Sequence, residues 1–97
     1  MRSQYVIHKF TLPLVGDESV ISMPQYARVL SVQDQGGELR VWALVDVCNP
    51  LVSHLFQIVG TGREVEGFGH TLLGDYLSTV QMGAYVWHIF YKGEVEA

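Results

Sequence analysis

The stretch Val41-Trp42-Ala43-Leu44-Val45-Asp46 (VWALVD) contains the longest uninterrupted apolar run of the chain, residues 41–45, and it is rich in residues that favour β-strands. Two further runs have the same character, namely 55–59 (LFQIV) and 85–90 (YVWHIF). A strand that is apolar on both faces belongs in the middle of a layered structure. The three runs therefore predict a compact β core.

Turn signals divide the rest of the chain into short strands. Pro13 and Pro24 each end a strand, because proline cannot donate to the ladder, and Gly36-Gly37 supplies a tight hairpin turn. The expected strands are 6–12, 19–23, 27–33, 38–46, 54–60, 76–80 and 84–92. The pattern predicts an all-β fold, a compact antiparallel sandwich or small barrel of about seven strands.

Two segments leave the strand pattern. Residues 68–80 carry apolar side chains at helical spacing but also two glycines, which favours at most one short helical turn near Leu72 followed by a strand. The last five residues, 93–97, form a polar tail that we expect to be frayed.

Length and composition indicate a single folded domain over residues 1–97. The chain is 48% hydrophobic, which disfavours disorder. The formal net charge is -4, with no basic stripe to meet a phosphate backbone, so direct nucleic-acid binding is disfavoured. An acidic surface suits a partner with a basic groove.

The single cysteine, Cys48, excludes a disulfide within the chain and a Cys-based zinc site, and it points to a reducing compartment. No run approaches the ~20 apolar residues of a membrane helix, and the N-terminus lacks the apolar segment of a signal peptide. We therefore expect a cytoplasmic protein that contacts no membrane.

The loop after the strand 54–60 is the first candidate site. Gly60-Thr61-Gly62-Arg63 contains two glycines after a strand, as phosphate-binding loops do. Val65 stands where the third glycine of a dinucleotide fingerprint belongs, and no Walker lysine follows. The simpler interpretation is a strand-exit turn; the alternative is a small ligand held by backbone N–H groups and Arg63.

Catalytic chemistry finds little support. The four histidines, His8, His54, His70 and His88, show no metal-ligand spacing, so we predict no metal and no cofactor. Cys48 and His54 form a nucleophile and base only if they touch, and packing roles are simpler. The acids Asp46, Asp75, Glu64 and Glu66 are interpreted as solvated or turn-capping. We predict no catalytic residues and a protein that is not an enzyme.

Aromatic and charged side chains form the second candidate site. A small two-layer domain cannot hide all its strand aromatics, and Trp and Tyr dominate protein-binding hot spots. An exposed aromatic face serves either self-association, giving a homodimer, or a partner protein. The predicted partner-binding residues are Trp42, Arg63, Glu64, Glu66, Tyr85 and Trp87.

The segments 41–46, 58–62 and 83–90, together with 7–10 and 21–24, resemble a family of small bacteriophage proteins of unknown function. Its members carry WALVD, GTG and a terminal hydrophobic-His-hydrophobic-Phe strand in this order. Trp87 and Val47 depart from the family pattern, which has a smaller apolar residue and a proline there. The resemblance implies a setting inside a bacterial cell and offers no catalytic residues to transfer.

These observations lead to three expectations of function. The first is a phage-encoded binding protein that inhibits host machinery, such as a defence complex with a basic surface, in the manner of an anti-CRISPR or other anti-defence inhibitor. The second is an oligomeric sponge that sequesters a nucleotide-like signal at Gly60, Thr61, Gly62 and Arg63. The third is a virion or structural accessory protein.

Overall fold

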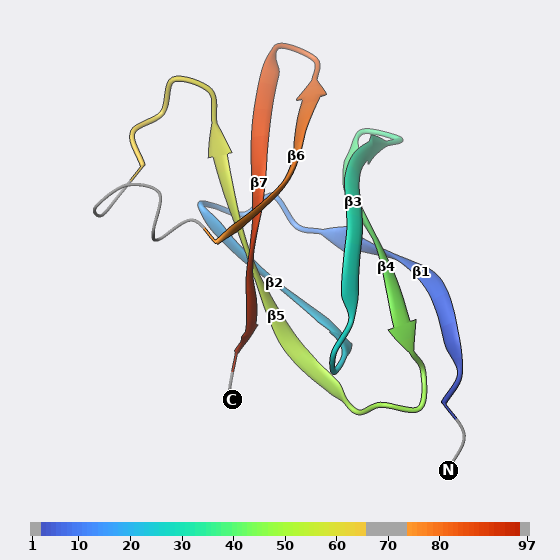
Figure 1. Ribbon diagram of the computed structural model, residues 1–97. Coiled ribbons are helices and arrows are strands. Elements are labelled where there is room, and N and C mark those ends of the chain that lie inside the picture. The colour runs from blue at the N-terminus through green and yellow to red at the C-terminus, as the bar shows by residue number, and fades with distance from the viewer. Residues whose placement is uncertain (1–2, 66–73, 96–97) are drawn as a thin grey trace.

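The computed structural model describes residues 3–65 and 74–95 of the chain, and these residues fold into seven strands (Figure 1). The strands are β1 (Tyr5–Leu12), β2 (Glu18–Pro24), β3 (Arg28–Gln35), β4 (Glu38–Asp46), β5 (Leu51–Gly60), β6 (Asp75–Met82) and β7 (Tyr85–Val95). All pairings are antiparallel.

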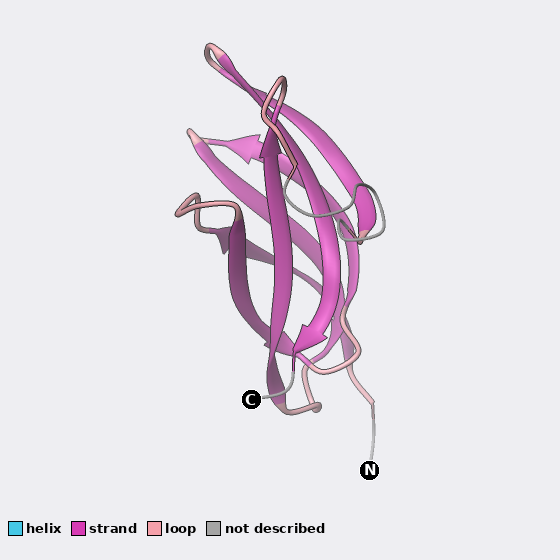
Figure 2. Ribbon diagram, turned by 90° about the vertical axis from the view of Figure 1, so that its left-hand side faces the viewer, coloured by secondary structure: helices cyan, strands magenta, loops and turns pink. Residues whose placement is uncertain are grey.

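The strands form two sheets that pack face to face. The three-stranded sheet has the order β1-β4-β3, and the four-stranded sheet has the order β2-β5-β7-β6. Figure 2 shows strands and connecting loops in the described part of the chain, without a helix. The prediction of an all-β sandwich of seven strands is confirmed; the sheets do not close into a barrel.

Within residues 3–65 and 74–95, no helix has the length and apolar character needed to cross a membrane.

The run 41–46 lies at the centre of the three-stranded sheet, where β4 is flanked by β1 and β3. Val41, Ala43 and Val45 are buried, whereas Trp42 and Leu44 alternate with them on the outer face and are half-buried. From the other sheet the core receives Ile21, Met23, Phe56, Ile58, Val80 and Ile89. The alternation along β4 thus determines which face meets the second sheet.

One side of the sandwich is joined by a hydrogen bond between the sheets. The backbone N–H of Val32 in β3 donates to Oγ of Ser78 in β6 over 3.1 Å. On the other side β1 and β2 are the edge strands of their sheets. This hydrogen bond therefore joins the edge strands β3 and β6 on one side of the sandwich, and β1 and β2 are the edge strands on the other side.

Two strands extend three residues beyond the ends predicted for them. β5 begins at Leu51 rather than at His54. β7 continues to Val95, so the expected frayed tail was wrong for Gly93, Glu94 and Val95, which pair with β5 across a register shift. A positive φ of 100° at Gly93 fits that irregularity. The helical turn expected near Leu72 lies outside the described residues, whereas the strand expected after it is β6.

Candidate functional site

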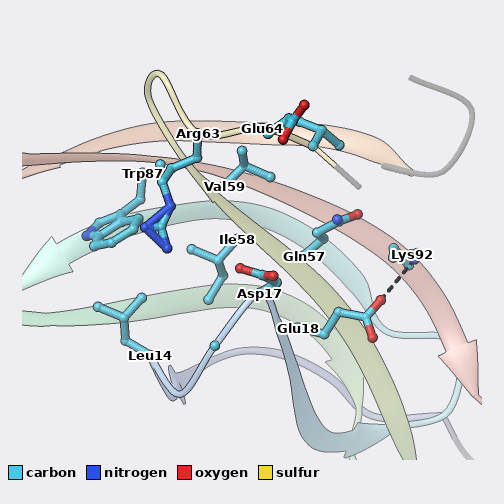
Figure 3. Close-up of a pocket in the computed structure, with 13 residues that line it drawn as sticks. Leu14, Asp17, Glu18, Gln57, Ile58, Val59, Arg63, Glu64, Trp87 and Lys92 are labelled. Carbon is cyan, nitrogen blue, oxygen red and sulfur yellow. Dashed lines mark hydrogen bonds and ion pairs between the residues drawn. The ribbon is translucent and has the colours of Figure 1, made fainter. Parts of the chain in front are cut away.

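An open groove of about 880 Å³ lies beside the end of β5 and is here called the β5 groove. Its walls come from the loop between β1 and β2, from β5 and the turn that follows it, and from β7 (Figure 3). Ligand sites in proteins fall in the range of roughly 300–1,000 Å³. The groove has the size of a binding site for a small molecule or a peptide segment.

A difference in strand length creates the groove. β2 begins at Glu18, which pairs with Gln57, but β5 continues to Gly60. The backbone N–H of Ile58 donates to the carbonyl oxygen of Asp17 over 2.8 Å, and the chain before Asp17 runs toward β1. In an antiparallel strand both backbone groups of every second residue point to the same side. The N–H of Gly60 therefore faces the groove where β2 has no residue to pair with it, whereas its carbonyl accepts a hydrogen bond from Arg63.

Gly60 also sets the arrangement of two predicted binding residues. A Cβ at this position would lie 3.1 Å from Cγ of Arg63 and 3.3 Å from Cζ3 of Trp87. Both side chains therefore pack over the bare backbone of Gly60, and Figure 3 shows the Arg63 guanidinium pointing toward the Trp87 ring. The ring of Tyr85 stacks beside Trp87 with a centroid distance of 5.6 Å. Glycine here permits a flat aromatic and cationic wall.

Carboxylates outnumber the free cation along the groove. Glu18 pairs with Lys92 over 3.0 Å, so these two charges compensate each other. Asp17, Glu64 and Arg63 remain, and none of them forms an ion pair within the described structure. The Oε1 atom of Gln57, which also lines the groove, is buried and receives no hydrogen bond from the described residues. Among the unpaired charges of the groove, two carboxylates thus stand against one guanidinium.

A chain of hydrogen bonds crosses the outer face of the four-stranded sheet next to the groove. Thr61 Oγ1 lies 2.6 Å from Nε2 of His88, and the other ring nitrogen of His88 lies 3.0 Å from Thr79 Oγ1. Thr79 Oγ1 in turn lies 2.7 Å from the hydroxyl of Tyr76. Both nitrogens of His88 are thereby occupied. The bonds hold the turn that carries Thr61 to β7.

His54 has a structural environment. It is fully buried, its Nδ1 atom lies 2.7 Å from the hydroxyl of Tyr91, and its Nε2 atom faces the carbonyl oxygens of Met23 and Pro24 at 3.2 and 3.1 Å. Burial, and secondarily the Glu94 carboxylate, raise the pKa of Tyr91 above its usual 10.0. Both nitrogens of His54 are engaged, so it is not a base for Cys48, which lies at the exposed turn after β4.

The acid Asp46 caps the same turn. Its Oδ1 atom accepts hydrogen bonds from the backbone N–H groups of Gln4 and Cys48, each over 3.0 Å. These bonds hold the pKa of Asp46 below its usual 3.8. Its role is structural, as the sequence indicated for this carboxylate. Within the described residues no three His, Cys, Asp or Glu side chains gather in a potential metal site.

The predicted partner-binding residues divide between the two layers. Arg63, Glu64 and Trp87 line the β5 groove, and Tyr85 extends its aromatic wall. Trp42 lies apart, on the outer face of the three-stranded sheet opposite Lys9. Glu66 lies outside the described residues, as does His70. The structure thus brings four of the six residues together.

The predicted ligand-binding turn divides in a similar way. Gly60 and Arg63 line the groove, Thr61 bonds to His88, and Gly62 has the positive φ of 84° that a strand-exit turn requires. The backbone N–H of Arg63 donates to the carbonyl of Gly60 over 3.0 Å and closes this turn. The simpler interpretation of the glycines as turn residues accounts for Gly62, and close packing accounts for Gly60.

Several groove residues carried no signal in the sequence. Leu14 and Asp17 belong to the loop after β1, and Gln57 is one polar residue within an apolar strand. Only the register of β2 on β5 brings the loop to Ile58. Nothing in the local sequence indicates which strand the loop after β1 approaches.

Comparison with known proteins identifies a family of unknown function. A family model described as Domain of unknown function (DUF7352) matches residues 3–97. Neither the curated proteins nor the solved structures contain a significant match to the chain.

Proposed function

The chain belongs to this family of unknown function, Domain of unknown function (DUF7352), and we propose that it is a non-enzymatic binding domain whose β5 groove holds a segment of a protein partner. The observation that carries the proposal is the convergence of Trp87, Tyr85, Arg63 and Glu64 on one open groove from two separate parts of the sequence.

The make-up of the groove supports a protein partner. Stacked Tyr85 and Trp87 give a large rigid contact area, and aromatic and arginine side chains carry most of the energy of protein interfaces. Asp17 and Glu64 disfavour a ligand with several phosphates, because they would repel it at short range. A protein surface that presents cations and one apolar side chain fits these charges.

The biological outcome that we propose is inhibition of the partner. The resemblance of the sequence to small phage proteins supports an inhibitor of host machinery, acting in the bacterial cytoplasm. The net charge of -4 supports an inhibitor that covers a basic surface of its partner. A defence complex that binds nucleic acid is one partner of this kind.

The test is affinity purification of the tagged protein from a bacterial host, with three matched variants. We expect one host protein to co-purify in near-equal amount with the wild type and with Asp75→Asn, a change at the start of β6 outside the groove. We expect Trp87→Ser combined with Arg63→Glu to lose it. The proposal falls if the groove variant retains the partner, and Trp42→Ser then asks whether the contact lies on the three-stranded sheet.

A nucleotide-like ligand is a second proposal, since the Arg63 guanidinium and the Trp87 ring lie together over Gly60, where a base could stack and a phosphate could be neutralised. Binding only to the folded state would raise the melting temperature by an amount set by ligand concentration and Kd. A panel of cyclic nucleotides that produces no rise in Tm removes this second proposal. A rise that disappears in Arg63→Glu would favour it over the protein partner.

A further inference from the structure

We propose that the occupant of the β5 groove is an extended, basic peptide segment that pairs with the exposed end of β5 and places lysine or arginine side chains on Asp17, Glu64 and Gln57. This inference rests on the proposed function and specifies its partner. It draws on the backbone, the charges and one unsatisfied polar atom of the groove.

The backbone supports an extended segment. β5 runs past the point where β2 starts, and its last bond on that side is from Ile58 N–H to the carbonyl of Asp17. The alternation of the ladder directs the N–H of Gly60 into the groove. A peptide strand that continues the line of β2 would accept from this N–H through a backbone carbonyl. Addition of a strand to an exposed sheet edge is a common mode of peptide recognition.

The charges support a basic segment. Lys92 is already paired with Glu18, and the Arg63 side chain turns toward Trp87. The carboxylates of Asp17 and Glu64 remain without a cation among the described residues, and Figure 3 shows both among the residues that line the groove. Basic side chains of the occupant would complement each of them.

The orphan acceptor supports the same chemistry independently of the acids. Oε1 of Gln57 is buried and receives no hydrogen bond from the described residues, although buried polar atoms are nearly always paired. If the Gln57 side chain turns into the groove, a donor of the occupant would satisfy it. Lysine and arginine carry donors and no acceptor, so they match both Gln57 and the carboxylates.

The occupant also requires one apolar side chain. Trp87 and Leu14 line one end of the groove, and Tyr85 stacks behind Trp87. In an extended peptide successive side chains point to opposite faces. A sequence in which basic residues alternate with apolar ones would therefore direct its cations to the acidic side and an aromatic ring to Trp87.

The test uses a fluorescent peptide of about eight residues in which arginine and lysine alternate with valine around a central tyrosine. Its comparison peptide carries glutamate in place of every basic residue. We expect the basic peptide alone to bind the full chain, with an affinity that falls as salt is raised.

Three variants separate the contributions. Asp17→Asn combined with Glu64→Gln should weaken binding by about tenfold or more, whereas Asp75→Asn should leave it unchanged. Gln57→Met should weaken binding without lowering the melting temperature, since it removes a buried acceptor that has no partner in the unbound protein. Circular dichroism confirms that each variant is folded.

The inference is overturned if neither peptide binds, if the acidic peptide binds as tightly as the basic one, or if the double variant keeps full affinity. The proposed function has a separate outcome. Suppose that a folded partner is captured through Trp87 while no peptide binds. That result would support the proposed binding function and would refute only the proposal of an extended basic segment.

Discussion

Tyr91 donates a hydrogen bond to His54 across the interior of the four-stranded sheet. The tautomer follows from the partners: Nε2 of His54 faces two backbone carbonyl oxygens, which only accept, so Nε2 carries the hydrogen. In the tautomer with this hydrogen Nδ1 accepts, and the Tyr91 hydroxyl at 2.7 Å is its donor. The fully buried histidine has a hydrogen-bond partner at both nitrogens.

Removing that donor should destabilise the fold. Tyr91→Phe leaves Nδ1 of His54 buried without a partner, which costs about 1–3 kcal/mol. Urea denaturation monitored by tryptophan fluorescence measures the change in the free energy of unfolding. Tyr76→Phe is the matched control, because its hydroxyl bonds Thr79 at the exposed surface, and its effect should be much smaller. Equal losses for both variants would contradict this role of His54.

Asp46 should make stability depend on pH in the acid range. Its pKa in the folded protein lies below 3.8, so the unfolded chain takes up the proton first as pH falls. The stabilisation is fully present above the unfolded-state pKa and is lost as pH falls through the lower folded-state pKa. We expect Asp46→Asn to be less stable than the wild type at neutral pH, and the difference to shrink on acidification. A difference that stays constant between pH 6 and about pH 2.5 would show that the carboxylate is not the cause.

Two glycines with similar backbone angles should respond differently to alanine. Gly37 has φ of 84° with open space where a Cβ would point, and Gly74 has φ of 81° with the carbonyl oxygen of Tyr91 in that place. Gly37→Ala should cost only the left-handed strain, about 1–2 kcal/mol. Gly74→Ala adds a clash with backbone that cannot rotate away, and we expect about 3 kcal/mol or more. Thermal and urea unfolding of the two variants measures the difference in their free energies of unfolding. Equal losses would mean that the backbone near Gly74 shifts to accommodate the methyl group.

Gly60→Ala should act on binding more than on stability. Gly60 has no positive φ, so the backbone accepts alanine. The added methyl group would press on Arg63 and Trp87 at 3.1 and 3.3 Å and displace the wall of the groove. We expect the melting temperature to fall by a few degrees at most, and capture of the partner to be lost in the same purification. Normal capture would place the contact away from this wall.

Much of the fold could be predicted from alternation and turn chemistry. The run 41–46 shows a buried face and an outer face as the strand period requires, and the glycine pair at 36–37 forms the hairpin turn, with φ of 65° and 84°. The extension of β7 through Gly93 was not predicted, because this segment is polar in composition. It is a strand because it pairs with β5, which is distant in the sequence. Local sequence does not show long-range pairing.

The candidate site was predictable in part for the same reason. Trp87 and Arg63 were identified by residue type, because aromatic and arginine side chains dominate protein-binding surfaces. Asp17 and Gln57 were not identified from the sequence. They line the groove because of the register of β2 against β5, and because β2 begins at Glu18 and leaves the end of β5 without a neighbouring strand. The separation of Trp42 from the other aromatics also required the sheet order, which places β4 and β7 in different layers.

The order of strands along the chain has a consequence for synthesis. The three-stranded sheet is complete once residue 46 has left the ribosome, yet β2, which precedes two of its strands, pairs only with β5. Until β5 has emerged, Ile21 and Met23, buried in the finished protein, have no sheet to join. The strands of the two sheets thus alternate in the order in which they are synthesised. We expect neither sheet to be stable alone, and we expect the protein to fold and unfold in one cooperative transition.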